Sequence, residues 1–425
     1  NLLSSDKHER YVVWEMRLYI LSYHPELSAE EIFAEFMHWG DLQDCSGATG
    51  HYDNERNPQR RLRVGYVSPD FRHHTSRFYF EPLFTHHNRQ CVELFAYSNV
   101  KVADDYTERF KKLFDHWRDI GPMSDEAAAQ LVREDGIDIL VDGCNHMRDE
   151  RLGLFARKPA PVQVTWLGAA WTSGLPTMDY VLFDPYLAPA GTLAREAIVR
   201  LPHTFVPFRP REDFGPTGQA PCARNGYVTF GYFGRTERLN HRVFRAWGRI
   251  LAALPEARLI LDFRAFGDPA TRDYYQGFLA RCGVDGKRVT LRHSPEVSKA
   301  LNEIDIMFDS FPHSGGTMSY DAVYMGVPLL TLAARPPLGR IGAGIMNNLG
   351  LSEWVAADEQ SYVEKAVAFA GDMKGLAELR RGMSARLAAS PLRNEAGYAR
   401  DVERAYREMW RRWCAGEPVG AFDVL

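Results

Sequence analysis

Two long stretches of the chain alternate short apolar runs with amphipathic segments of helical length, and this alternation restricts the fold more than any other feature. The first stretch covers 59–210 and the second covers 226–393, with a linker rich in Pro, Gly and Arg at 203–226. Strands that alternate with helices form parallel sheets with helices on both faces. We therefore predict an α/β fold of two Rossmann-like, doubly wound domains, with a ligand-binding cleft between them at the carboxyl ends of the strands.

The apolar runs give the expected strand positions. In the first domain the expected strands are Arg63–Val67, Val92–Tyr97, Ile137–Val141, Val162–Trp166 and Tyr180–Phe183. In the second domain they are Tyr227–Phe233, Arg258–Phe263, Arg288–Leu291, Ile304–Phe308 and Leu329–Leu332.

Helical segments are predicted at both ends of the chain. Residues 1–58 contain a helix that is apolar on nearly every side at 11–21, and Ser28 and Glu31 then form a capping box for a second helix. A pair of helices is typical of the end of a helical repeat arm. Because the chain starts with Asn rather than Met, we expect the natural chain to extend further. The tail, 394–425, begins with an amphipathic helix rich in Arg, Tyr and Trp.

The composition argues against several classes of function. The 425 residues are 45% hydrophobic, enough for two cores, and the formal charge of −4 gives no positive field for nucleic acid. The six cysteines are far apart, which favours reduced thiols in a cytoplasmic protein over disulfides or zinc ligands. No apolar stretch is long enough for a membrane span, and no metal-binding or P-loop motif is present. We therefore predict neither a metal nor a cofactor.

A glycine-rich turn in the second domain is the strongest candidate for a binding site. The strand at Ile304–Phe308 ends at Asp309, and a Pro/Gly/Ser loop leads to Thr317, which is expected to cap a helix. Glycine allows a ligand to approach the backbone, and a helix N-terminus favours phosphate. A tight turn without a ligand is the alternative.

Histidines and acids follow two strands of the first domain. His74 follows the first strand, and Asp142 and His146 follow the third. Carboxyl ends of parallel strands share one edge, so these side chains could supply a general base near neutral pH. Solvated histidines in surface loops are the alternative.

Three further features remain open from the residues alone. The small-residue loop Trp166–Gly174 either admits a substrate to its backbone amides or is a structural turn. Arg235 and Arg238 leave a strand of the second domain and either clamp a diphosphate or form surface ion pairs, and Arg340 could add a charge at another helix.

Taken in order, several segments resemble glycosyltransferase family 41, which holds protein O-GlcNAc transferases, SPINDLY-type O-fucosyltransferases and related bacterial enzymes with tetratricopeptide (TPR) arms. The resemblance covers about 61–415. It is carried by LRVGYVSPDFRHH at 62–74, FARKPAPVQVTWLG at 155–168, TSGLPTMDYVLFDP at 172–185, LPHTF at 201–205, DSFPHSGGT at 309–317 with MGVP at 325–328, and the closing run at 390–417.

The resemblance implies a two-domain GT-B fold and inverting, metal-independent transfer from a nucleotide sugar to a protein hydroxyl. By position, His74 matches the family's active-site histidine of the first domain, a base or sugar contact. Asp142 and His146 fall in a loop that lines the cleft in other members. The helices before residue 58 match the end of a TPR arm.

In the second domain the resemblance implies a nucleotide site. Gly315, Gly316 and Thr317 match the diphosphate-binding turn, and Asp321 matches the acid that contacts the ribose. Arg238 stands where the family has an essential lysine that touches the diphosphate.

Other positions also depart from the family pattern. Arg235 replaces a residue that is often Gln or Asn, Met318 replaces a threonine, and Pro337 replaces a histidine. Ala169-Ala170-Trp171 stands where the family has Tyr-Pro-Gly, which is expected to place an indole beside the sugar pocket. These departures bear on the identity of the donor.

The sequence thus predicts a cytoplasmic bacterial-type glycosyltransferase that acts on Ser or Thr of a partner protein. UDP-GlcNAc is the family's usual donor, and GDP-fucose or another UDP- or GDP-sugar is an alternative. Transfer to asparagine or to a small molecule is a second possibility. A non-catalytic member that binds a nucleotide or a partner protein is the third.

Overall fold

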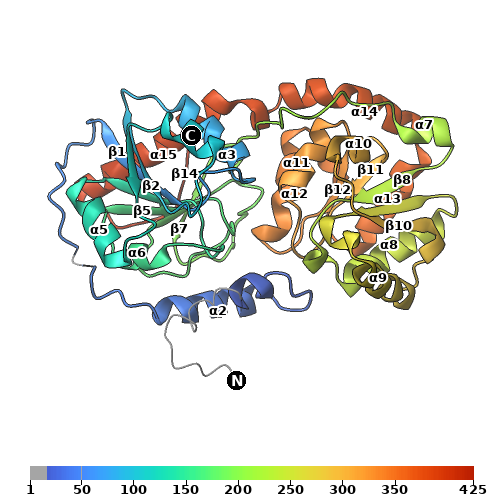
Figure 1. The fold of residues 1–425 in the computed structure, drawn as a ribbon, viewed down its shortest axis with the longest axis horizontal. Coiled ribbons are helices and arrows are strands. Elements are labelled where there is room, and N and C mark those ends of the chain that lie inside the picture. The colour runs from blue at the N-terminus through green and yellow to red at the C-terminus, as the bar shows by residue number, and fades with distance from the viewer. Residues whose placement is uncertain (1–16, 49) are drawn as a thin grey trace. The chain divides into compact units, whose positions relative to one another are not determined.

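Each of the two parallel β-sheets in the molecule belongs to a unit of its own (Figure 1). The protein is described by a computed structural model, which covers residues 17–48 and 50–425. Contacts group 27–209 and 394–425, together with the described residues up to Ser22, as unit 1. They group 23–26 and 210–393 as unit 2.

The sheet of unit 1 has eight strands in the order β14-β7-β6-β5-β4-β1-β2-β3, and its strand pairs are parallel. The strands are β1 (Leu62–Ser68), β2 (Val92–Ser98), β3 (His116–Asp119), β4 (Ile139–Asp142), β5 (Val162–Thr165), β6 (Tyr180–Phe183), β7 (Ala197–Arg200) and β14 (Phe422–Asp423). Strand β1 is buried at every position except Arg63, as expected for a strand with helices on both faces. The carboxyl ends of β1, β4 and β5 therefore lie side by side.

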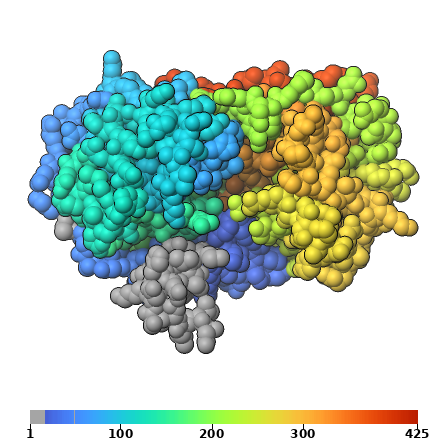
Figure 2. Space-filling view, viewed as in Figure 1, coloured from blue at the N-terminus to red at the C-terminus, as the bar shows by residue number. Residues whose placement is uncertain are grey.

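Besides the helical residues 17–21, six helices belong to the described part of unit 1. They are α2 (Ala29–Asp41), α3 (Arg77–His86), α4 (Asp105–Lys111), α5 (Asp125–Glu134), α6 (Leu152–Ala156) and α15 (Glu395–Ala415). The tail helix α15 packs beside α3, and the Tyr406 hydroxyl lies 3.0 Å from that of Tyr66 on β1 (Figure 1). Helices α4 and α5 belong to the cyan-to-teal stretch that forms part of the surface of unit 1 (Figure 2).

Helix α2 begins as the sequence predicts, with a capping box. The Ser28 hydroxyl accepts from the Glu31 N–H at 3.1 Å, and the Ser28 N–H donates to the Glu31 carboxylate at 2.8 Å. At its other end a Cβ built on Gly40 would lie 1.6 Å from the carbonyl oxygen of Gly174, so only glycine allows this packing. Of the preceding predicted helix, residues 17–21 are helical, and 6–16 lie outside the described residues.

The sheet of unit 2 has six parallel strands in the order β10-β9-β8-β11-β12-β13. They are β8 (Thr229–Tyr232), β9 (Arg258–Asp262), β10 (Val289–Arg292), β11 (Ile306–Phe308), β12 (Leu329–Leu332) and β13 (Val355–Ala356). The helices are α7 (Pro221–Asn225), α8 (His241–Ala253), α9 (Pro269–Arg281), α10 (Val297–Leu301), α11 (Thr317–Tyr324), α12 (Ile341–Asn348), α13 (Glu359–Gly371) and α14 (Met373–Ala388). Strand β11 thus has β8 and β12 as its neighbours.

The predicted α/β class and all ten predicted strands are confirmed. The prediction missed β3, β7, β13 and β14, which have four residues or fewer. Among the described residues, no helix combines the length and apolar character needed to cross a membrane.

Candidate functional site

The loop that follows β11 is organised by the buried carboxylate of Asp309. One carboxylate oxygen accepts from the N–H groups of Ser310 at 2.9 Å and Gly315 at 2.6 Å. The other oxygen accepts from the hydroxyl of Thr331 on β12 at 2.8 Å. Burial raises the pKa of Asp309 to about 6, and these donors oppose the rise. Asp309 therefore holds both ends of the glycine-rich turn.

Helix α11 begins directly after this turn. Its N-cap residue is Gly316, and no side-chain hydrogen bond among the described residues caps the helix. A Cβ built on Gly316 would meet no described atom within 4 Å, so there is space beside its backbone. Uncapped N–H groups and the positive end of the helix dipole favour an anion such as phosphate. Thr317 is the first helical residue rather than the cap, so that prediction is wrong.

Asp321 lies one turn into α11. Its side chain is buried, and neither carboxylate oxygen has a hydrogen-bond partner among the described residues. Burial raises its pKa to about 7, Arg211 lowers this pKa, and Asp213 raises it. Leaving a buried acceptor unsatisfied costs about 1–3 kcal/mol, so this carboxylate is suited to accept hydrogen bonds from the hydroxyl groups of a ligand.

Arginines surround the turn from the neighbouring strands. Arg238 ends the short helix η1 (Thr236–Arg238) after β8, and its charge lowers the pKa of Asp309 against the effect of burial. Arg235 immediately precedes η1, and Arg340 precedes α12. The carboxyl ends of these strands therefore combine positive charge with the N-terminus of α11, which suits a diphosphate.

In unit 1, the loop after β1 places His74 beside an acid. The Nδ1 atom of His74 lies 3.1 Å from Asp70 Oδ2 and 2.9 Å from the Ser76 hydroxyl. The His74 side chain is 34% exposed, whereas that of Asp70 is 12% exposed. A carboxylate at Nδ1 favours the tautomer in which Nε2 carries the lone pair. Nε2 is then the nitrogen that could take a proton from a substrate.

Asp142 and His146 were predicted as catalytic groups, but both side chains are buried within unit 1. The Asp142 carboxylate accepts from the N–H groups of Cys144 and Asn145 and from the Thr165 hydroxyl, so it holds its own loop in shape. Its pKa is raised to about 6, with burial as the largest cause.

His146 Nε2 donates to the carbonyl oxygen of Ser173 at 2.8 Å. Its ring contacts Phe36 and Trp39 of α2, and burial lowers its pKa to about 4. A buried, neutral histidine against a helix cannot exchange protons with a substrate in this arrangement. The placement of Asp142 and His146 therefore assigns both a structural role, which corrects the prediction.

The loop after β5 also differs from the expectation. The indole of Trp171 was expected beside a sugar pocket, but it is buried, and its Nε1–H donates to the carbonyl oxygen of Leu193 at 2.9 Å. Its ring lies 5.6 Å from that of Phe36 on α2. Leu167 and Ala170 have φ angles of 74° and 46°, which is strained backbone for residues with a Cβ. The loop is thus held by packing against α2.

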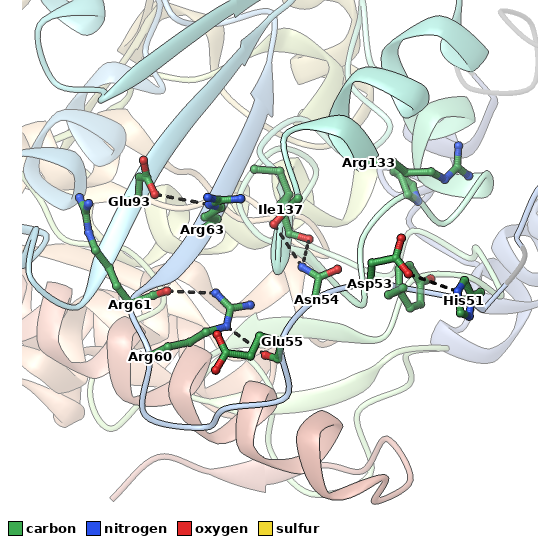
Figure 3. Close-up of a pocket in the computed structure, with 13 residues that line it drawn as sticks. His51, Asp53, Asn54, Glu55, Arg60, Arg61, Arg63, Glu93, Arg133 and Ile137 are labelled. Atoms are coloured by element: carbon green, nitrogen blue, oxygen red, sulfur yellow. Dashed lines mark hydrogen bonds and ion pairs between the residues drawn. The ribbon is translucent and has the colours of Figure 1, made fainter.

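A pocket of about 440 Å³ lies in unit 1 at the amino ends of the strands of the sheet (Figure 3). Its arginines all donate to protein groups: Arg60 to Asp138, Arg61 to the carbonyl oxygen of Val92, Arg63 to that of Asp135, and Arg133 to that of Arg157. The bonds of Arg60 and Arg61 fasten the linker before β1 to the sheet. The pocket therefore lies at the opposite end of these strands from His74.

Two acids of the candidate site were not singled out from the sequence. Asp309 was read only as the end of a strand, and Asp70 was counted as an acid near the histidine pair without a role of its own. The signals were available, because an acid before a glycine-rich turn can bind its N–H groups and an acid four residues before a histidine can orient it.

Comparison with known proteins gives relatives along almost the whole chain. The model of "Glycosyl transferase family 41" matches residues 19–207 and 222–402. A "Probable UDP-N-acetylglucosamine--peptide N-acetylglucosaminyltransferase SPINDLY" of Petunia hybrida is 34% identical over 412 residues. The protein of that name from Arabidopsis thaliana is 35% identical over 412 residues. These matches cover 94% of this chain but only 44% and 45% of the relatives, so the chain spans less than half of their length.

Solved structures agree with the fold. A mutant of the O-GlcNAc transferase of Thermobaculum terrenum superposes with a TM-score of 0.90 at 34% identity, covering 96% of this chain and 79% of that one. The sucrose-phosphate synthase of Thermosynechococcus elongatus has a TM-score of 0.51 at 14% identity, covering 82% and 99% of the two chains, and it shares the GT-B fold alone. Given the family match over most of its length and the collinear motifs, the chain belongs to glycosyl transferase family 41.

Proposed function

We propose that the protein is a glycosyltransferase that moves a sugar from a nucleoside diphosphate sugar to a Ser or Thr hydroxyl of a protein. One observation carries the proposal: the unpaired, buried Asp321 lies one turn from the uncapped N-terminus of α11. A ribose offers hydroxyl donors, and the adjoining diphosphate offers negative charge, so one molecule could satisfy both features. The names of the relatives, which specify UDP-N-acetylglucosamine and a peptide, support the same reading.

The side chains have distinct roles in this proposal. The N–H groups at Gly316 and the charge of Arg238 stabilise the negative charge that develops on the departing diphosphate. Because these groups supply positive charge, the proposed reaction requires no metal. His74, oriented by Asp70, accepts the proton of the attacking hydroxyl. Direct attack by that hydroxyl on the anomeric carbon inverts its configuration.

UDP-GlcNAc is the proposed donor, and GDP-fucose is the alternative that binding experiments should separate from it. The proposed location is the cytoplasm, which is supported by the six cysteines, all of them free thiols. The proposed macromolecular partner is the acceptor protein.

The proposal is tested by binding and transfer measured together. The purified chain should bind UDP or GDP and should transfer labelled sugar to a library of Ser/Thr peptides, with a product that alkaline β-elimination releases. A product that resists elimination would instead indicate transfer to asparagine. His74→Ala should abolish transfer while leaving nucleotide affinity within about twofold, because the base does not contact the nucleotide.

His51→Ala is the matched control, since this histidine lies in unit 1 with a side chain that is 85% exposed. It should leave both activities unchanged. Nucleotide binding without transfer from any donor would favour the non-catalytic alternative, and absence of nucleotide binding would contradict the proposal.

A further inference from the structure

A four-residue segment that precedes α2 in sequence packs on the candidate nucleotide site of unit 2. Contacts group Tyr23–Glu26 with unit 2, although the residues on either side of this segment belong to unit 1. Tyr23 is only 8% exposed. This degree of burial for a loop aromatic indicates a specific packing position.

The Tyr23 ring contacts both loops that form the site. Its centroid lies 4.5 Å from that of His313, with 31° between the ring planes. His313 belongs to the glycine-rich turn, and its carbonyl oxygen accepts from the Ser310 hydroxyl at 2.8 Å. On the other side, the Arg238 guanidinium carbon lies 6.0 Å from the Tyr23 ring centroid, at the limit of a cation–π contact. The ring therefore touches a turn residue and also lies next to the cation assigned to the diphosphate.

The rest of the segment is fastened to the start of α8. The carbonyl oxygen of Pro25 accepts from Arg242 Nη1 at 2.7 Å, and Arg242 Nε donates to Glu359 at 2.6 Å. The Glu26 carboxylate lies 3.0 Å from His241 Nε2. Helix α8 directly follows the loop that carries Arg238. These contacts fix where the Tyr23 ring can lie.

We propose that Tyr23 is a positioning residue of the nucleotide site, which restrains Arg238 and His313 so that the site is organised before the diphosphate binds. The inference rests on the proposed function, because it assigns Arg238 to the diphosphate. An arginine side chain loses conformational entropy when it binds a ligand. An arginine that is already restrained in the free protein loses less, so its ligand binds more tightly. Removing the ring should therefore weaken the binding of the diphosphate and spare the nucleoside.

The test compares UDP with uridine, and GDP with guanosine, by isothermal titration calorimetry on the full chain. Tyr23→Ala should weaken binding of the diphosphate about three- to tenfold, the range expected for loss of a cation–π contact and its restraint. Affinity for the nucleoside should change less than twofold. Tyr23→Phe, which keeps the ring, should retain most of the diphosphate affinity.

Tyr274→Ala is the matched control, because this tyrosine of α9 in the same unit is 61% exposed. It should bind like the wild type. The double variant Tyr23→Ala/Arg238→Ala should lose less affinity than the two single losses added together, since the ring acts partly through the arginine.

Other outcomes of these binding measurements would overturn either the inference about Tyr23 or the proposed function. Equal losses for the diphosphate and the nucleoside would mean that Tyr23 only stabilises the fold and would overturn the inference, as would unchanged UDP affinity in Tyr23→Ala. If the alanine variant does not fold, Tyr23→Leu keeps the buried apolar volume without a ring face and must show the same selective loss. A wild-type chain that binds neither UDP nor GDP would overturn the proposed function itself.

Discussion

Donor binding should weaken as the pH falls from 8 to 6, because Asp321 must be ionised to accept hydrogen bonds from two hydroxyl groups. Burial raises the pKa of this carboxyl to about 7, with an opposing contribution from Arg211 and a smaller raising one from Asp213. The empty site thus holds a proton at pH 6 that the ligand must displace. With a pKa near 7, about nine-tenths of the groups are ionised at pH 8 and about one-tenth at pH 6, so the apparent Kd should rise about tenfold.

The assay is a titration of the chain with UDP-GlcNAc between pH 5.5 and 8.5. The diphosphate of this ligand is esterified at both ends, so it has no proton that titrates in this range, whereas free UDP has one. Protonation of a histidine near the site would add positive charge and would strengthen anion binding at low pH. The sign of the slope therefore separates Asp321 from the histidines.

Asp321→Asn supplies the decisive comparison, because the amide oxygen accepts a hydrogen bond from a hydroxyl but the side chain does not titrate. This variant should bind with an affinity that is flat or that rises slightly at low pH. Asp273→Asn, on the exposed part of α9, should keep the wild-type slope. A wild-type Kd that is the same at pH 6 and pH 8, or an Asp321→Asn variant with the wild-type slope, would refute the reasoning.

Three further predictions concern other parts of the molecule. Arg238→Ala should weaken nucleoside diphosphate binding by about 1.5–3 kcal/mol, the scale of a charge-assisted hydrogen bond, and Arg238→Lys should restore part of it; calorimetry checks both. Burial lowers the pKa of His146 to about 4, so this histidine binds its proton less tightly in the folded than in the unfolded chain. The free energy of unfolding should therefore fall by about 3 kcal/mol as the pH drops from 6.5 to 4. Urea unfolding of the wild type and His146→Asn measures that loss, which should be absent in the variant. Gly40→Ala forces a methyl group into the carbonyl of Gly174 and should destabilise the protein by at least about 1–3 kcal/mol. Urea unfolding measures this loss, and Gly382→Ala is the control because a Cβ at Gly382 would meet no described atom within 4 Å.

The architecture was predictable because it depends on patterns that are local in sequence. Alternating apolar and amphipathic segments specify a doubly wound sheet, and the Ser28–Glu31 capping box marks the start of α2 without reference to the rest of the fold. The missed strands are short pieces such as β13 and β14. Such strands form because a neighbouring strand offers unpaired backbone N–H and C=O groups. The residues of the short strand itself carry no sequence pattern that would predict this pairing.

Burial explains the errors at the site. His146 and Trp171 occupy the expected loops, and their residue types suit a catalytic or sugar-binding role. Their environment is set by α2, which lies more than a hundred residues earlier in sequence and covers both rings. A spacing argument places a residue at the edge of a sheet, but it does not reveal which helix covers that edge.

Asp309 and Asp321 show why hydrogen-bond satisfaction separates structure from function better than residue type does. Both are buried aspartates of unit 2, twelve positions apart, and burial raises both pKa values. Asp309 has donors for both oxygens from the chain itself, so the fold alone accounts for it. Asp321 has none among the described residues, and selection for stability would remove a penalty of about 1–3 kcal/mol if nothing offset it. A ligand that supplies the missing donors is the simplest offset, and in the proposed function those donors are the ribose hydroxyls of the sugar nucleotide.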